Sequence, residues 1–467
     1  MELEAAKKLI TKYEGLRAGF AMKANVAHRY YLGDNDILHR KPKEQCPDEG
    51  PNPLRNADNK IAFNFHALLV DQKASYMFTA PPLFDTKDDT LNEIIAATLG
   101  DGYAKECKDL CVDASNAGIG WLHYWIDEKT GFNYAMVPSV QVWPVYTTRL
   151  KKQLEAVMRT YYMVDDNGDE WQIFELWNDT ECQAFRQRGE LFTPYDMFNY
   201  YSPFSGLAQP SNTFRHNLGT VPFIPFQNNN VCSSDLDKIK RLVDSYDKTY
   251  SGFVDDLEDI QQVIFVLTNY GGADLKQFLS DLKYYKTIQV ESEGSEDKSG
   301  VSTLTIDIPV EARDKLLDIT RKAIFDMGQG IDPQQQGFDN TSGEAMKFLY
   351  SLLELKAGLM ETEFRQGFGE LVRAISRYYS GKEPEQIIQT WTRTSIRNDA
   401  ELVDMCQKSV GVISNKTILK NHPFVENAED EEKELAAEKE QAAKDADIYR
   451  KAFSQQNNDG DVDGDEE

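Results

Sequence analysis

The sequence lacks the motifs by which several protein classes are recognised. It contains no GxxxxGK[ST] phosphate loop and no GxSxG motif, so it gives no sign of ATP hydrolysis or of a serine hydrolase centre. Its apolar runs are too short to cross a bilayer, and the first residues have no hydrophobic signal-peptide core. We therefore expect a chain that is made in the cytoplasm and has no membrane partner.

Cysteine and histidine are scarce, with six of each, and no HExxH motif occurs. Cys107 and Cys111 lie four residues apart on a predicted helix, but no second Cys or His pair follows nearby. We expect buried free thiols there rather than a metal site or a disulfide framework. His66 lies in an apolar helical pattern, which is typical of a core residue. No metal and no cofactor is expected.

Positive charge is also in short supply. The chain has 51 basic and 77 acidic side chains and a net charge of −26. Proteins that bind DNA by its phosphates carry a basic surface, which this composition does not favour. The protein must either avoid nucleic acid or lie near it without holding it. Paired carboxylates arise by chance in so acidic a chain, so a glycosidase centre gains little support, and the acidic tail 457–467 is interpreted as solvated.

The composition, 41% hydrophobic and 11% aromatic over 467 residues, predicts a folded chain of several structural units. Residues 1 to about 230 show a mixed α+β pattern that ends in a Pro/Ser/Asn-rich loop at 203–217. Helical spacing of apolar residues covers 1–13, 59–77 and 91–117, and alternating strand patterns cover 120–126, 134–137, 156–163 and 171–177.

The second half is dominated by long helical patterns. Apolar residues recur every three or four positions over 235–268, which predicts one helix about 50 Å long. A small unit at 271–309 follows, with a helix at 274–282 and strands at 287–291 and 301–308. Further elements are predicted as a helix at 310–327, a polar loop at 328–341, a helix at 342–381, a strand at 386–398 and helices at 399–455.

Two local features of this half stand out. Thr341 and Glu344 form a capping box before the third long helix, and Gly358, Gly367 and Gly369 lie inside that helix, where they favour a bend or a close contact. No Lys or Arg occurs between residues 323 and 346, which include the polar loop.

Several segments resemble the portal proteins of siphophages, which are tailed bacteriophages. They occur in the family's order from about residue 25 to 430. The segments are RYYLGDNDIL (29–38), NKIAFNFHALLVD (59–71), LGTVPFIPF (218–226), DLED (256–259), SGEAMK (342–347), ISNKTIL (413–419) and HPFV (422–425).

The resemblance implies a ring-forming portal fold with named parts. It implies a mixed wing (1–230 with the strand 386–398), stem helices (235–268 and 310–327), an α/β clip (271–309), a tunnel loop (328–341), a long wing helix (342–381) and a helical crown (399–455). The implied function is that of a non-enzymatic head portal subunit in the virion, forming a dodecameric channel for genome packaging and ejection.

The resemblance also implies partners and site residues. The expected partners are further copies of the chain, terminase, scaffolding and major capsid proteins, a head-completion or connector protein, and double-stranded DNA that passes without sequence-specific binding. The tunnel loop would face DNA through Ile331, Asp332, Gln334, Gln335, Gln336, Phe338, Asp339 and Asn340. The clip would dock terminase and connector through Glu291, Glu293, Glu296, Asp297 and Lys298.

Two other hypotheses stay open at this point. One is another ring-forming or scaffolding virion protein, and the other is a soluble acid/base hydrolase with a helical arm. The missing catalytic motifs count against the hydrolase, and electron microscopy of the purified protein would separate a ring from a globular monomer.

Overall fold

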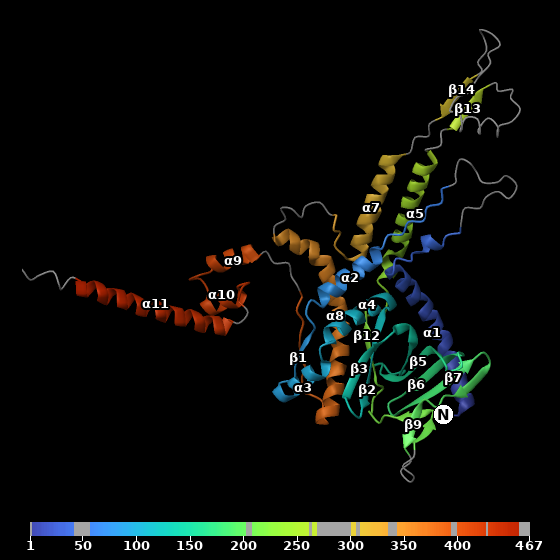
Figure 1. Ribbon diagram of the computed structural model, residues 1–467, viewed down its shortest axis with the longest axis horizontal. Helices are drawn as coiled ribbons and strands as arrows, with labels where there is room; N and C mark the ends of the chain where they lie inside the picture. Colours follow the sequence, from blue (N-terminus) through green and yellow to red (C-terminus); the bar gives the residue numbers. More distant parts are fainter. Residues whose placement is uncertain are drawn as a thin grey trace, which may run out of the picture. The chain divides into compact units, whose positions relative to one another are not determined.

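The computed structural model describes residues 2–41, 57–201, 208–260, 264–268, 300–304, 309–334, 343–393, 399–425 and 428–456 (Figure 1). The chain divides into two compact units. The first comprises Met1–Pro333 and Leu352–Arg393, and the second comprises Gln334–Ser351 and Thr394–Glu467.

The first unit contains two larger antiparallel sheets, and their strands confirm the predicted ones. One sheet has the order β12–β2–β3, with bounds Phe223–Gln227, Ile119–Asp127 and Gly131–Val137. The other has the order β11–β7–β6–β5–β4, with β8 beside β7. Its strands are β4 (Val142–Tyr146), β5 (Leu154–Val164), β6 (Glu170–Trp177), β7 (Glu181–Arg188), β8 (Leu191–Pro194) and β11 (Thr213–Arg215).

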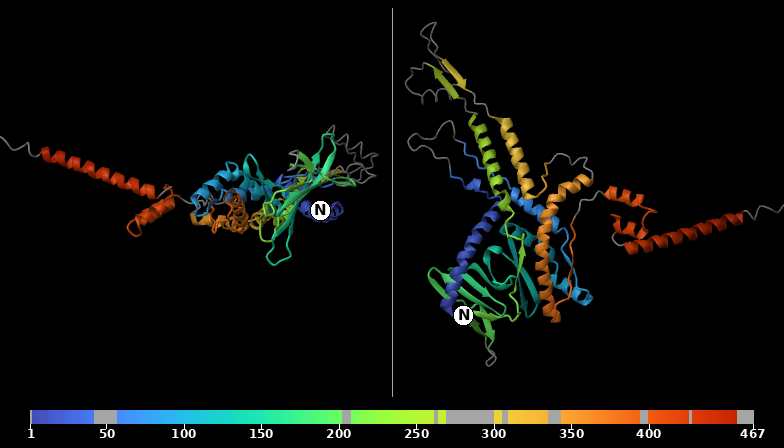
Figure 2. Two further views of the ribbon diagram at one scale, coloured as in Figure 1. Left: turned by 90° about the horizontal axis from the view of Figure 1, so that it is seen from below. Right: turned by 180° about the vertical axis from the view of Figure 1, so that it is seen from behind.

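Helices pack on these sheets through apolar side chains. Helix α1 (Leu3–Tyr31) lies along the larger sheet (Figure 2). Its Ala6 and Ile10 pack with Met158, Phe174 and Phe185 of that sheet. Helices α4 (Tyr103–Ala117) and α8 (Gly343–Ser380) enclose the largest core with the smaller sheet and α3 (Asp89–Leu99). Strand β1 (Leu83–Asp85) pairs with β15 (Ile388–Thr390), and β9 (Phe198–Tyr201) pairs with β10 (Ala208–Ser211).

Glycine allows α8 to lie close to β12. A Cβ added at Gly367 would lie 2.6 Å from the ring of Phe226, whose centroid is 4.9 Å from that of Phe368. The close contact predicted for these glycines is thus confirmed at Gly367. At Gly358 an added Cβ would meet nothing within 4 Å.

Two helices rise as a pair, α5 (Leu236–Ile260) and α7 (Val310–Gly328), and α7 agrees with its predicted span (Figure 1). The single helix predicted over 235–268 is wrong at its end. Residues Ile264–Thr268 form strand β13, which pairs antiparallel with β14 (Gly300–Leu304). The run Ile-Phe-Val-Leu-Thr consists largely of β-branched and aromatic residues, which favour a strand over a continued helix.

Two other helix predictions are wrong at their bounds. Helix α2 begins at Phe65 rather than 59, because the Asn64 side chain accepts a hydrogen bond from Ala67 N–H and caps it there. The helix predicted over 91–117 is two helices, α3 and α4. Gly100 ends α3 with a φ of 67°, a conformation that glycine adopts without strain.

The predicted loop 203–217 includes strands β10 and β11 in its described part. The strand predicted over 386–398 is shorter, because β15 spans Ile388–Thr390. The elements predicted at 274–282 and 287–291, residues 394–398 and the tail 457–467 lie outside the described residues.

The second unit is helical, as predicted for 399–455. It contains α9 (Asp399–Lys408), α10 (Asn415–Asn421) and α11 (Ala428–Gln456). Among its residues with a described side chain, only Cys406 is buried.

Candidate functional site

An apolar seam joins α5 and α7 near the start of α5 and the end of α7. Ile239 and Val243 of α5 pack with Ile324 and Phe325 of α7, and Phe65 of α2 completes the cluster. Ile239, Val243 and Tyr246 are spaced by four and three, which places them on one face of α5. The seam fixes α5 against α7, and both against α2.

An extended segment, residues 57–63, lies along another face of α5, and we call it the strap. Alternate backbone N–H groups of the strap donate to α5 side chains one helical turn apart. These hydrogen bonds join Asn59 to Asp255 (2.6 Å), Ile61 to the Ser251 hydroxyl (3.0 Å) and Phe63 to Asp247 (3.0 Å). Because the three α5 side chains are buried, the strap fixes the rotation of the helix.

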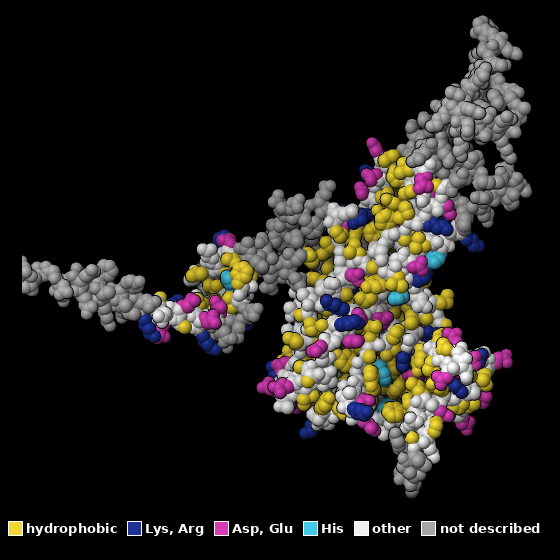
Figure 3. Space-filling model, in the orientation of Figure 1, with side chains coloured by type: hydrophobic (Ala, Val, Ile, Leu, Met, Phe, Trp, Pro, Cys, Tyr) yellow, Lys and Arg dark blue, Asp and Glu magenta, His cyan; other side chains and the backbone are white. Residues whose placement is uncertain are grey.

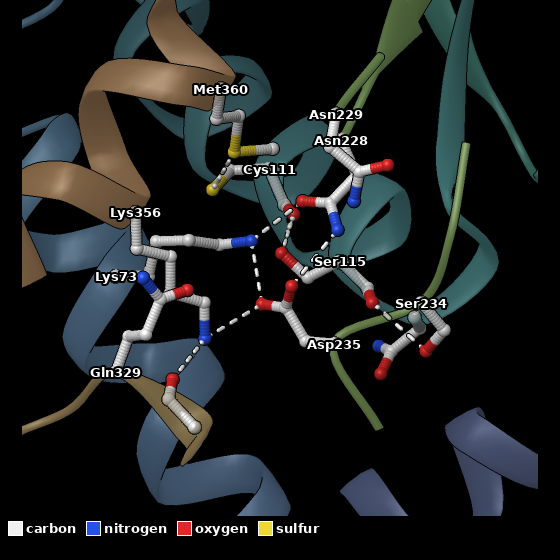
Figure 4. A network of polar contacts seen from close by, with 12 residues as sticks. Lys73, Cys111, Ser115, Asn228, Asn229, Ser234, Asp235, Gln329, Lys356 and Met360 are labelled. Atoms are coloured by element: carbon white, nitrogen blue, oxygen red, sulfur yellow. Dashed lines mark hydrogen bonds and ion pairs between the residues drawn. The ribbon is translucent and has the colours of Figure 1, made fainter. Parts of the chain in front are cut away.

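A buried charge cluster lies at the start of α5 (Figure 4). The Asp235 carboxylate is 2.7 Å from the Lys73 ammonium of α2 and 3.0 Å from the Lys356 ammonium of α8. Asn228 donates to Asp235 (2.9 Å) and accepts from Lys73 (2.7 Å). Lys356 also donates to the carbonyl of Gly328, at the end of α7 (2.9 Å). The cluster therefore ties four elements together.

The charges of this cluster depend on one another. Burial alone would raise the pKa of Asp235, but the Lys356 and Lys73 ammonium groups hold it far below its usual range. Burial lowers the pKa of Lys356, and Asp235 opposes that change. Two ammonium groups share one carboxylate, so the carboxylate is the member whose removal leaves buried charge unpaired.

His66 lies next to this cluster and behaves as the core residue that the sequence predicted. Its Nε2 lies 2.8 Å from the Asn116 amide oxygen, and burial lowers the pKa of the ring to about 4. Cys107 and Cys111 are buried free thiols, also as predicted. Burial raises the pKa of Cys107 to about 12 and that of Cys111 to about 11.

The first residues after α7 are held against α2. Gln329 adopts a left-handed conformation, and the N–H of Gly330 donates to the carbonyl of Phe325 (3.0 Å). The side-chain amide of Gln72 then pairs with the backbone of Ile331. It accepts from the Ile331 N–H (2.9 Å) and donates to the Ile331 carbonyl (2.7 Å). A side chain here makes the two bonds that a neighbouring strand would make.

Asp332 is held in turn by α7. The Arg321 guanidinium donates two hydrogen bonds to its carboxylate, at 2.9 and 2.7 Å. Arg321 lies over the ring of Phe325, 5.3 Å from the centroid, which restricts the guanidinium further. Such two-pronged pairs fix geometry as well as adding energy.

There is no spare room between this segment and α2. A Cβ added at Gly328 would lie 2.6 Å from a methyl of Leu69, and one at Gly330 would lie 2.1 Å from the other methyl. Leu69 is itself buried in the core. Both glycines are therefore needed for the close approach.

The predicted site residues divide between described and undescribed parts. Ile331, Asp332 and Gln334 are described, and the first two make the contacts given above. The other tunnel-loop residues, Gln335, Gln336, Phe338, Asp339 and Asn340, lie outside the described residues, as do the clip residues Glu291, Glu293, Glu296, Asp297 and Lys298.

Sequence reasoning missed Gln72, Lys73 and Lys356 as organising residues. The sequence held a signal for the two lysines, because each interrupts the apolar face of a helical pattern. Burying an ammonium group there without a partner would cost free energy, so a buried acidic partner could have been expected. No signal marked Gln72, whose partner is a backbone 259 positions away.

Two properties hold for the residues that the structure describes. No group of three or more His, Cys, Asp or Glu side chains in them is arranged to hold a metal ion. None of the helices in the described ranges is both long enough and apolar enough to cross a membrane.

The chain is similar to known proteins over almost its whole length. It is 41% identical to the portal protein of Clostridium phage phiCD119 over 96% of this chain and 99% of that protein. It is 29% identical to the portal protein of Bacillus phage SPP1 over 94% of this chain and 87% of that protein.

Solved structures give weaker likenesses. The neck of an empty GTA particle, computed with C6 symmetry, matches with a TM-score of 0.45, and the neck of a native GTA particle, computed with C12 symmetry, with 0.41. Both are 11% identical, and each match covers 76% of this chain and 88% of the other. Scores this low bear on neither fold nor function.

A family model described as phage portal protein, SPP1 Gp6-like, matches residues 20–445. That span contains the helix pair, the strap and the charge cluster, and it agrees with the resemblance seen in the short sequence segments. The chain therefore belongs to the SPP1 Gp6-like family of phage portal proteins, which are structural components of the virion and not enzymes.

Proposed function

We propose that copies of this chain close into a dodecameric ring at the portal vertex of the phage head. The ring surrounds a channel through which double-stranded DNA enters during packaging and leaves during ejection. Membership of the portal family supports this proposal, as does the geometry of α5 and α7.

The observation that carries the ring is an apolar stripe on α7. Ala312, Leu316, Ile319, Ala323 and Met327 recur at spacings of three and four along about 23 Å of helix. Leu316, Ile319 and Met327 are 48, 58 and 59% exposed, and hydrophobic side chains lie at the surface over α7 in Figure 3. An exposed apolar stripe of this length marks an interaction surface.

The partner of the stripe is a different surface of the next copy. The buried seam and the strap already occupy two faces of α5, and α7 contributes its seam face to the same pair. A contact between two different surfaces repeats around an axis and closes a ring when the rotation is an integer fraction of a turn. Stem helices packed in this way leave their charged faces for the channel and the exterior.

The channel must release DNA as readily as it admits it. The net charge of −26, and the absence of Lys and Arg between residues 323 and 346, disfavour tight phosphate binding. The tunnel loop 328–341 is proposed to lie at the narrowest point. Residues 271–309 are proposed as the clip that docks terminase and later the head-completion protein, while scaffolding and major capsid proteins surround the wing.

Electron microscopy of the purified protein tests the ring. We expect rings with a central hole, and Ile319→Glu should yield monomers because it places a charge in the stripe. Lys322→Glu is the matched control, since it puts the same side chain on an exposed position of α7 outside the stripe. A globular monomer from the unaltered chain would remove the proposal.

Crosslinking tests the tunnel loop. Photoreactive probes at Gln334, Gln335 and Gln336 in packaging-arrested particles should label DNA more strongly than a probe at Asp179, in an exposed turn of the wing. Equal labelling at the loop and at Asp179 would contradict a loop that faces DNA.

A further inference from the structure

The contacts after α7 separate the tunnel loop into a root and a remainder, and we define the root as residues 328–332. We propose that Gln72, Arg321 and Lys356 are positioning residues that hold this root as part of the stem. On this proposal Ile331 and Asp332 do not face DNA, and the DNA-facing part begins beyond Pro333. The inference rests on the proposed portal function and names how its tunnel loop is positioned.

The backbone of the root is bonded to the body of the molecule. Lys356 binds the Gly328 carbonyl, Phe325 binds the Gly330 N–H, and Gln72 binds both backbone groups of Ile331. Polar backbone groups of consecutive loop residues are thus satisfied by the body of the molecule. A loop that slides on DNA would leave such groups to solvent or ligand.

The side chain of Asp332 is also held by the body of the molecule. The Asp332 carboxylate is 17% exposed, and both of its oxygens accept from Arg321. Facing DNA would require it to leave a paired cation and approach phosphate of its own sign. Leaving the pair would break two charge-assisted hydrogen bonds, and a phosphate would offer the carboxylate no attraction in return.

The root is also connected to the buried charge cluster. Lys356 joins the end of α7 to Asp235 at the start of α5, and Asp235 joins Lys73 of α2. Gln72 is the residue next to Lys73 on α2. The root is therefore attached to the same junction that fixes both stem helices.

Hydrogen exchange of the assembled full-length protein tests the inference. Arg321→Met should speed exchange of the Gly330 and Ile331 amides by about tenfold or more, because losing the charged pair frees the root to open. Arg313→Met is the matched control. Arg313 lies on the same helix and pairs with Asp256 at the other end, so its loss should leave exchange at the root unchanged.

A reversed pair supplies the rescue. Arg321→Asp combined with Asp332→Arg restores opposite charges at the same two positions, and exchange at the root should return toward the unaltered rate. Unchanged exchange in Arg321→Met, or equal acceleration in Arg313→Met, would overturn the positioning role.

Probe placement supplies a second measurement that stability alone would not move. In unaltered particles a photoreactive residue at Ile331 should label DNA no more than one at Asp179, and Arg321→Met should raise labelling from 331. Strong labelling of DNA from position 331 in unaltered particles would overturn this inference, but it would still agree with the proposed channel function. Failure of the protein to form rings removes the proposed function instead, so the two failures are distinguishable.

Discussion

Asn59 and Asp255 are separated by 196 positions, yet one carboxylate oxygen of Asp255 accepts both the backbone N–H and the side-chain amide of Asn59, at 2.6 and 3.0 Å. The bond from the Asn59 N–H is one of the three backbone hydrogen bonds that the strap donates to α5. The strap uses mainly backbone groups as donors, whereas α5 contributes side chains as acceptors. The specificity of the contact therefore lies in α5.

Ser251 provides the cleanest test of the strap. Ser251→Ala should lower the free energy of unfolding by about 1 to 2 kcal/mol, because the Ile61 N–H loses its acceptor in a part-buried contact. Ser245→Ala, on an exposed position of the same helix, shares the gain in helix propensity without that loss. Urea unfolding of both variants checks this, and equal midpoints would show that the strap does not hold α5.

Asp235 should be the most sensitive residue of the charge cluster. Asp235→Asn leaves the Lys73 and Lys356 ammonium groups buried without a counter-charge, which we expect to cost about 3 to 5 kcal/mol. Asp314→Asn removes an equal charge from an exposed position of α7 and should change stability by less than about 0.5 kcal/mol. Thermal unfolding compares the two, and a loss of similar size in both would argue against the cluster as a structural junction.

Asp113 should make stability depend on pH. Burial raises its pKa to about 6 from an ordinary 3.8, and the hydrogen bonds donated by Ser139 oppose this only in part. The folded state therefore binds the proton more tightly than the unfolded chain. Its contribution to stability is fully present below about pH 3.8 and is lost as the pH rises through about 6.

Replacing that carboxyl should remove this part of the pH dependence. Between pH 4 and pH 7 the unaltered protein should lose stability relative to Asp113→Asn, whose amide can still bond to Ser139. Asp109→Asn, one turn away beside Lys105, serves as the control. Parallel pH profiles for the unaltered protein and Asp113→Asn would contradict the expected titration.

Two glycines of α8 should respond in opposite directions. Gly367→Ala places a methyl against the Phe226 ring and should destabilise the protein by about 1 to 3 kcal/mol. Gly358→Ala has open space and should stabilise it by up to about 1 kcal/mol through helix propensity. Thermal unfolding midpoints give the sign directly, and a stabilised Gly367→Ala would show that α8 need not lie so close to β12.

The predictions agreed best with the structure where the apolar spacing of a segment fitted only a helix or only a strand. The hairpin β2–β3 and the helix α7 follow from local patterns, since each is set by apolar spacing and by nearby turn residues. The prediction over 235–268 failed because residues 264–268 are apolar at nearly every position. Such a run fits either a helix or a strand, and pairing with Gly300–Leu304 decided it.

The candidate site was less accessible from sequence, because its contacts join distant residues. Asn59 lies in a helical pattern but is held in the extended strap by Asp255, a residue that no local rule connects to it. From the sequence, Ile331 and Asp332 are ordinary loop residues, and only the fold brings Gln72 and Arg321 into contact with them. Polarity and glycine content identified the loop but could not show which part of it is fixed.

The different rise of an extended chain and of a helix limits how long a contact such as the strap can be. An extended chain advances about 6.6 Å for every two residues, whereas a helix advances about 6 Å for every four. The donors and acceptors therefore drift apart by about 0.6 Å per step, and the acceptors turn through about 40° around the helix at each step. The two steps between Asp247, Ser251 and Asp255 tolerate this drift, but donors and acceptors would no longer face each other in a much longer contact. Because the two spacings match over only one short interval, the three hydrogen bonds define a single position of the strap along α5.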